Sequence, residues 1–344
     1  MIAELKSHLP ELLGHRLTEW LSWVYWNIVA PMYAQPTLHW FFLLSTLAVA
    51  ALFFATRSAE ERRTSGGFLR YMFPREIYAH PSAVVDYKFY VVTQLVMTHL
   101  RLGQWVVGLA AILQIAEGIR WVMTAVFGPR ASADAQPGAI AVVAFTLVTA
   151  LAYDYARFLA HYLHHRVPAL WEFHKVHHSA EVLTPISSFR AHPVDQMIEF
   201  LLRLIATSAV AAVFGYFYPD GITELTVMNY AALTFLFYLT AHLRHSHIPL
   251  GYGRLSGIFL SPHMHQLHHS ADPRHFDKNF GFMFSIWDRM AGTLLIPEAG
   301  ERFRLGLPHG AGKFDTVWAL YFNPFVEAFR HIVGVLVPAA RRSS

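Results

Sequence analysis

The chain of 344 residues contains no cysteine. This absence excludes disulfide bonds, zinc sites built from thiolates, and iron–sulfur or haem groups held by cysteine. A metal ion could be bound only by histidine, aspartate or glutamate side chains. Charged residues are also scarce, at 15% of the chain, whereas 54% of the residues are hydrophobic. Soluble domains of this size are less apolar, so the composition predicts a protein of the lipid bilayer.

Other common signals are missing too. The N-terminal sequence lacks a basic start, an apolar run and a small-residue cleavage site, so we predict no removable signal peptide. The glycine pattern of flavin- and nicotinamide-binding folds is absent, as is the His-Glu-x-x-His pattern of zinc proteases. The 27 lysines and arginines are scattered between apolar runs, which argues against nucleic acid as a partner.

Several apolar runs have about the length at which a helix crosses a bilayer. The predicted spans are residues 37–56, 102–127 (after an interfacial stretch), 139–159, 197–218 and 225–243. Positive charges cluster from Arg57 to Lys88, which places that loop on the cytoplasmic side. The loops at 128–138 and 219–221 then face outward. We therefore predict an all-α fold, a multi-pass transmembrane helical bundle with a cytoplasmic histidine-rich metal-binding cap.

Many of the 22 histidines stand in short motifs at the predicted cytoplasmic ends of these helices. The first motif, HYLHH, carries His161 and His165 four residues apart, on one face of a helix. The second motif, HKVHH, recurs about ninety positions later as HQLHH, and we expect the three imidazoles of each copy to converge on one point. These two boxes contain His174, His177 and His178, and then His265, His268 and His269.

Further histidines accompany the boxes. The segment HLRHSH supplies His242, His245 and His247, and His192 lies before Pro193, where it is a candidate ligand or a support for one. By helical phase, His164 points away from His161 and His165, so we interpret it as a neighbour of the site. The spacing leaves the roles of His247 and His263 open.

Eight to ten clustered histidines exceed the four or so ligands that one metal ion takes, so two metal ions are implied. Nitrogen ligation with few carboxylates nearby argues against calcium and magnesium. A site against a membrane reaches lipid chains, whose C–H bonds are unactivated, and iron with dioxygen is suited to them. Two alternatives remain: a histidine-rich membrane metal transporter, which needs ligands near mid-span, and a zinc-dependent membrane hydrolase.

The ordered motifs HxxxH, HxxHH and HxxHH, followed by Trp-Asp and Gly-Thr, resemble the fatty acid hydroxylase and sterol desaturase superfamily. The resemblance covers residues 139–297 and includes further matching positions. These are Asp154, Leu170-Trp171, Arg190 to Pro193, Ser261-Pro262, Asn279 to Gly281, Trp287-Asp288 and Gly292-Thr293.

The resemblance implies a membrane di-iron oxygenase that takes two iron ions and dioxygen, with electrons from a separate donor protein. It implies hydroxylation or desaturation of a lipid of the fatty acyl, sterol, sphingolipid, carotenoid or alkylglycerol class. The predicted ligands are His161, His165, His174, His177, His178, His242, His245, His265, His268 and His269, with His192 as a further candidate. Four further side chains are candidates to orient the ligand imidazoles, by accepting a hydrogen bond from the ring N–H that does not face the metal ion. They are Asp154, Asp288, Asn279 and Glu172.

These interpretations divide the chain into four parts. Residues 1–36 form an N-terminal interfacial segment, and residues 37–138 an N-terminal transmembrane region. Residues 139–297 form a fatty acid hydroxylase-like catalytic domain, and residues 298–344 a C-terminal cytoplasmic tail.

Overall fold

A computed structural model describes residues 40–129, 137–218, 237–298, 300–309 and 312–336. Within these residues every regular element is a helix, and the β pairing consists of two isolated bridges, Phe259 with Phe284 and Ser270 with Leu305. The all-helical prediction is confirmed for this part of the chain. The predicted segment 1–36 and most of the predicted span 225–243 lie outside the described residues.

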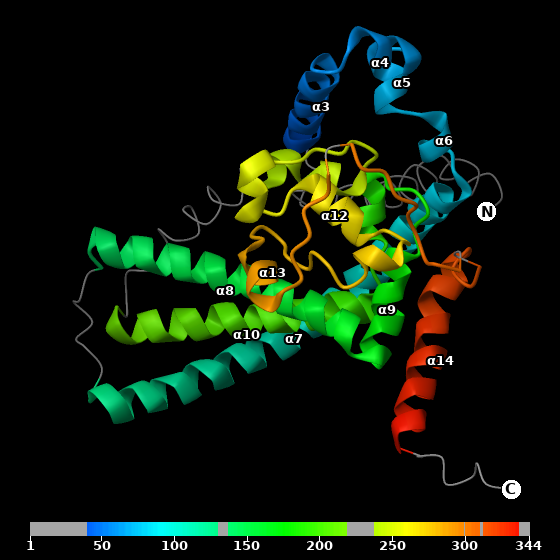
Figure 1. The fold of residues 1–344 in the computed structure, drawn as a ribbon. Coiled ribbons are helices and arrows are strands. Elements are labelled where there is room, and N and C mark those ends of the chain that lie inside the picture. The colour runs from blue at the N-terminus through cyan, green and yellow to red at the C-terminus, as the bar shows by residue number, and fades with distance from the viewer. Residues whose placement is uncertain (1–39, 130–136, 219–236, 299, 310–311, 337–344) are drawn as a thin grey trace, which may run out of the picture.

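Three long helices run side by side at one end of the molecule: α7 (Pro81–Phe127), α8 (Ala139–Arg166) and α10 (Pro193–Phe217) (Figure 1). α10 packs against both α7 and α8. Among the described residues, α8 and α10 are long and apolar enough to cross a membrane, and α3 (Trp40–Ala55) is a shorter apolar helix. The predicted spans 139–159 and 197–218 fall mainly within α8 and α10.

The helix α7 differs from its prediction. It runs unbroken from Pro81 to Phe127, where an interfacial stretch before a separate span from residue 102 was expected. Pro81 stands in the first turn, where its missing N–H would have no helical partner in any case, and His80 caps that turn by accepting from the Ser82 N–H. No proline lies between Pro81 and Pro129, so none ends the helix at residue 102.

Shorter elements make up most of the rest of the described chain (Figure 1). The α-helices among them are α4 (Ala59–Thr64), α5 (Phe68–Met72), α6 (Arg75–Tyr78), α9 (Pro168–His178), α12 (Pro262–His268), α13 (Ile286–Ala291) and α14 (Val317–Leu336). The 3-10 turns are η3 (Pro185–Phe189), η4 (His242–His245), η5 (Gly253–Gly257) and η6 (Pro273–His275). A proline in the first turn starts each of α9, α10 and α12, which fixes where the helical phase of the following side chains begins.

The buried side chain of Arg190 joins several of these elements. Its guanidinium forms an ion pair with Asp86 of α7 at 2.7 Å and donates to the Ser179 hydroxyl at 2.8 Å. It also donates to the carbonyl oxygens of Val176 in α9 at 3.0 Å and of Phe314, before α14, at 2.9 Å. One arginine therefore fixes α9 relative to α7 and to the chain that leads into α14.

We expect Asp86→Asn to lower the free energy of unfolding by about 3–5 kcal/mol, because it leaves the Arg190 charge buried without its counter-ion. Thermal unfolding of the detergent-purified protein would measure the effect. The control is Arg274→Gln, which breaks an exposed ion pair with Asp272 and should change stability by no more than about 0.5 kcal/mol. Equal effects of the two variants would contradict this account of Arg190.

Candidate metal centre

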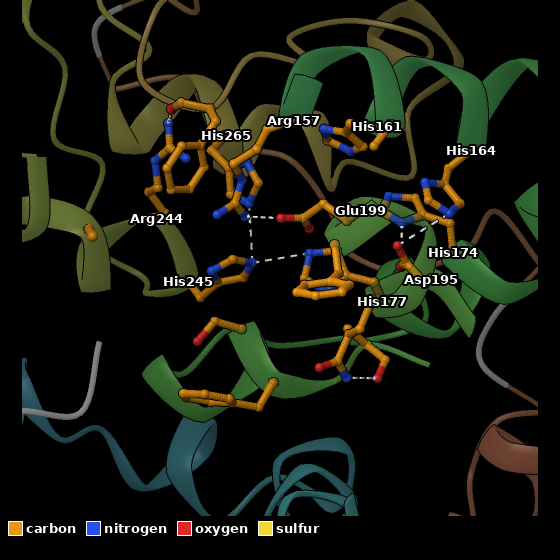
Figure 2. Close-up of a pocket in the computed structure, with 18 of the residues that line it drawn as sticks. Arg157, His161, His164, His174, His177, Asp195, Glu199, Arg244, His245 and His265 are labelled. Atoms are coloured by element: carbon orange, nitrogen blue, oxygen red, sulfur yellow. Dashed lines mark hydrogen bonds and ion pairs between the residues drawn. The ribbon is translucent and has the colours of Figure 1, made fainter. Parts of the chain in front are cut away.

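Two groups of histidines lie side by side where α8, α9, η4 and α12 meet. Group A contains His161, His165, His174, His178 and His268, and group B contains His177, His245, His265 and His269. Within each group the candidate ligand nitrogens lie within 4.8 Å of one another. Figure 2 shows members of both groups, among them His161, His174 and His265, gathered around one pocket.

The structure divides each HxxHH box between the two groups, which corrects the expectation that each box converges on one point. His174 and His178, four residues apart on α9, belong to group A, whereas His177 belongs to group B. In the second box His265 and His269 belong to group B and His268 to group A. Consecutive residues on a helix point about 100° apart, so an adjacent His-His pair cannot face a single centre.

Backbone carbonyls orient three of these rings. The Nδ1 of His161 lies 2.9 Å from the Phe280 carbonyl oxygen, that of His268 lies 2.7 Å from the Lys278 oxygen, and that of His177 lies 3.3 Å from the Arg190 oxygen. A carbonyl oxygen only accepts, so each Nδ1 carries the proton. The Nε2 lone pair of each ring is then free to bind a metal ion.

Asp195, in the first turn of α10, orients His174 in the same way. Its carboxylate accepts from His174 Nδ1 at 2.9 Å and lies 3.3 Å from His164 Nε2. His164 thus lies outside groups A and B, but with His174 and Asp195 it forms a third group whose candidate ligand atoms lie within 4.8 Å of one another. Our sequence reasoning missed Asp195. In the sequence, Asp195 could have been found as a carboxylate two residues after Pro193, in the segment that follows the first HxxHH box.

The inward-facing nitrogens fit metal ions. The Nε2 atoms of His161, His174 and His268 are buried without a hydrogen-bond partner among the described residues. In group B the Nε2 atoms of His265 and His245 lie 3.1 Å apart, and those of His245 and His177 lie 3.3 Å apart. Four nitrogens around one zinc ion at about 2.0–2.1 Å would be roughly 3.3 Å apart. A cation shared by the group would satisfy lone pairs that cannot all satisfy one another.

Burial also keeps these rings neutral. Desolvation is the main reason that the pKa values of His177 and His268 fall to about 3. At neutral pH both imidazoles are therefore unprotonated at the nitrogen that faces inward, which is the form that binds metals. The donor set as a whole fits two ions, one for each group.

The residues that the sequence predicted to orient ligand imidazoles lie farther from the inward-facing nitrogens than the histidine rings themselves. Asp154 accepts from the backbone N–H groups of Met283 and Phe284 at 2.7 and 3.1 Å, and from the Trp287 indole at 2.8 Å. These bonds hold the loop after α12 instead of a histidine ring, so the predicted contact is wrong for Asp154. Glu172 pairs with Lys175 at 2.6 Å and with the ring of His331 at 3.2 Å, which belongs to neither group.

Asp288 and Asn279 also bond to this loop. Asp288 accepts from the backbone N–H of Phe280 at 2.7 Å and of Gly281 at 2.8 Å, and the Asn279 amide bridges the carbonyls of Met264 and Leu295. Gly281 has no room for a side chain, since a Cβ there would lie 2.5 Å from the Phe284 oxygen and 2.8 Å from the Asp288 carboxylate. Together these residues set the carbonyls of Lys278 and Phe280 that orient His268 and His161.

Several predicted or undecided histidines lie outside both groups. His242 contacts the Thr46 hydroxyl through Nδ1 at 2.9 Å, so the structure does not bring this predicted ligand to either group. His192 caps α10 by accepting from the Val194 N–H, and its Nε2 lies 3.0 Å from the Tyr321 carbonyl. His247 and His263 likewise contact backbone carbonyls, those of Tyr71 and Glu301.

Two cavities flank the groups from different sides. One, of about 550 Å³, lies between α7, α8 and α10 and reaches His161 and His174 of group A and His177, His245 and His265 of group B. The other, of about 620 Å³, lies beside α9 and the chain before α14 and reaches His165, His178 and His268. Both groups are therefore open to the first cavity, whereas the second reaches group A alone.

The comparison with known families agrees with this architecture. Residues 146–293 match the fatty acid hydroxylase family model. This region, a little under half of the chain, is therefore similar to the fatty acid hydroxylase and sterol desaturase superfamily. Every histidine of groups A and B lies within the matched residues. No solved structure matches the chain.

The chain is also similar to curated proteins named as lipid-modifying enzymes. It is 29% identical to an ornithine lipid hydroxylase of Rhizobium tropici over 50% of this chain and 48% of that protein. It is 28% identical to an alkylglycerol monooxygenase of Danio rerio over 54% of this chain and 38% of that protein. A Delta(7)-sterol 5(6)-desaturase of Gibberella zeae is 31% identical over 42% of this chain and 36% of that protein. The matches thus span less than half the length of these relatives.

We expect the purified protein to hold about two transition-metal ions per chain, and His178→Ala or His269→Ala to lower this content to about one. Each change removes a nitrogen from one group only. Elemental analysis by mass spectrometry, normalised to protein, would measure it. The control is His263→Gln, on the same helix as His265 but outside both groups, which should keep two ions. A content near one in the unchanged protein would contradict the assignment of two sites.

Proposed function

We propose that the protein is an integral membrane di-iron oxygenase that hydroxylates or desaturates a lipid. The observation that carries this proposal is the pair of buried imidazole groups, both of which border one cavity between the ends of long apolar helices. When bound, two iron ions would supply the redox chemistry by which dioxygen attacks an unactivated C–H bond. Nine histidines would hold them, five in group A and four in group B.

The protein's own residues hold and orient these ligands. Asp195 and the carbonyls of Arg190, Lys278 and Phe280 keep the protons of four rings at Nδ1, so the ligand nitrogens stay deprotonated and aimed inward. The walls of the cavity hold the lipid with its reacting carbon near the ligands and limit the access of water. Hydroxylation of a C–H bond by dioxygen forms an alcohol and water and consumes a pair of electrons and a pair of protons.

The substrate and the electron donor are proposed from different observations. The relatives named above act on ornithine lipid, alkylglycerol and a sterol, which supports a lipid substrate of one of the classes that the motifs allow. Electrons would come from a separate donor protein, because the sequence carries no flavin or nicotinamide fingerprint.

Two other functions have less support. A zinc hydrolase with a single catalytic ion takes about three protein ligands, far fewer than the histidines of groups A and B. A metal transporter needs ligands near the middle of a span. The ligands here lie at the end of α8, in the short helices α9 and α12, and in η4.

We expect the iron-reconstituted protein to consume dioxygen and convert a membrane lipid when supplied with an electron donor. Lipid mass spectrometry, comparing cells that express the protein with cells that lack it, would find the product by a gain of one oxygen or a loss of two hydrogens. His177→Ala and His268→Ala should each reduce turnover by about a hundredfold or more, whereas His263→Gln should retain it. Turnover that survives either ligand variant would refute the role of that group.

We further propose a multi-pass arrangement with the histidine groups on the cytoplasmic face. Single cysteines can report it, since the chain has none. Glu181 and Arg274, both exposed near the groups, should share one side of the membrane, and Pro129 and Gly138, between α7 and α8, should lie on the other. Labelling of intact cells with an impermeant thiol reagent should modify only the latter pair. Modification of all four positions, or of Glu181 and Arg274 alone, would overturn the proposed topology.

A further inference from the structure

The cavity that borders both histidine groups carries a charged network on its wall. Arg157 of α8 and Arg203 of α10 approach the same carboxylate oxygen of Glu199, at 3.0 and 3.3 Å. Arg203 also donates to the Tyr153 hydroxyl at 3.0 Å, and the Arg157 guanidinium lies 3.5 Å from the centre of the Phe282 ring. In Figure 2, Arg157 and Glu199 lie among the histidines and not apart from them. A cavity for a plain hydrocarbon chain needs no such groups.

The positive charges of this wall exceed its negative ones. Two guanidinium groups share Glu199, and Arg244 adds a third positive charge whose hydrogen bonds go to the carbonyls of Leu260 and Phe282. Asp195, the other carboxylate that lines the cavity, contacts His174 and His164. A partly buried positive charge without an equal counter-charge is unfavourable, and an anionic ligand would remove that penalty.

The network also lies at a defined distance from the metal ligands. Arg157 precedes His161 by four residues on α8, so both lie on one face of the helix and are separated by about 6 Å along its axis. Apolar side chains of α7, α10 and the chain before η4, among them Met97, Phe200 and Phe237, complete the cavity. An anion bound at Arg157 would thus lie about one helical turn from the ligands of group A, with apolar surface nearby for a lipid tail.

We propose that Arg157 and Arg203 bind the anionic group, a phosphate or a carboxylate, of the lipid substrate. This inference rests on the proposed function and narrows its substrate class. The carbon that is oxidised then lies in or beside the head group, because a helical turn leaves room for only a few bonds between anion and ligands. Glu199 holds the two guanidinium groups in place and reduces their charge in the absence of lipid.

A structural role makes a different prediction. If these ion pairs only join α8 to α10, then Glu199→Gln and the two arginine variants should all act in the same direction. If the arginines bind an anion, Arg157→Gln and Arg203→Gln should weaken its binding, whereas Glu199→Gln should strengthen it by removing the competing carboxylate. The sign of the Glu199 effect therefore separates the two roles.

The test measures binding to the zinc-loaded protein, which holds the site without redox turnover, so its outcome is independent of the oxygenase assay. Isothermal titration would compare dioctanoyl phosphatidylglycerol with neutral dioctanoylglycerol and with inorganic phosphate. We expect the anionic lipid to bind at least about tenfold more tightly than either of the others. It alone combines an anionic group, which forms charge-assisted hydrogen bonds, with apolar tails. Arg157→Gln and Arg203→Gln should each raise its Kd about tenfold or more, and Glu199→Gln should lower it several-fold.

Arg330→Gln removes an exposed positive charge on α14 and should leave the Kd unchanged, which controls for net charge. Zinc content and the unfolding temperature would confirm that each variant is folded. If Arg157→Gln does not fold, Arg203→Gln and Glu199→Gln still carry the opposite-sign test. Equal binding of the neutral lipid, equal binding of inorganic phosphate alone, or weaker binding in Glu199→Gln would each overturn the proposal.

Discussion

Imidazole nitrogens that point their lone pairs into the same space cannot all hydrogen-bond to one another. A fold that gathers nine such rings therefore needs other contacts to keep the rings in place. Here each of four rings is anchored from behind, through its Nδ1, by an acceptor on a neighbouring element. The inward nitrogens are then left for cations. The positions of α9, α12 and the loop after α12 follow from this requirement, since each supplies ligands, anchors or both.

Arg190 links this requirement to the rest of the fold. Its side chain is buried against α7, α9 and the chain before α14, while its own carbonyl oxygen accepts from His177. Any shift of α9 relative to α7 would therefore move a metal ligand. The charged wall formed by Arg157, Arg203 and Glu199 borders the same ligands from the side of the long helices. Scaffold, candidate metal ligands and cavity are thus parts of one contact network.

Much of the site could be predicted from the sequence because helical spacing is local. The pairs His161 with His165 and His174 with His178 share a face by their four-residue separation alone. The same helical phase separates each adjacent His-His pair, but which histidines of different helices meet in one group was not predictable, because it depends on how α9 and α12 are oriented in space. The roles of Asp154 and Asp288 were mistaken for the same reason. Their closeness to the boxes in sequence suggested ring contacts, whereas their carboxylates bind backbone N–H groups of a loop.

Three of the four groups that orient ligand rings are main-chain carbonyls, those of Arg190, Lys278 and Phe280. A carbonyl oxygen is present whatever side chain its residue carries, so replacement of Lys278 would not by itself delete an acceptor. Substitutions are then restricted mainly at the residues that shape the loop. One of these is Gly281, where a side chain would collide with Asp288. In this part of the chain, tolerance to mutation should follow backbone shape more closely than closeness to the two histidine groups.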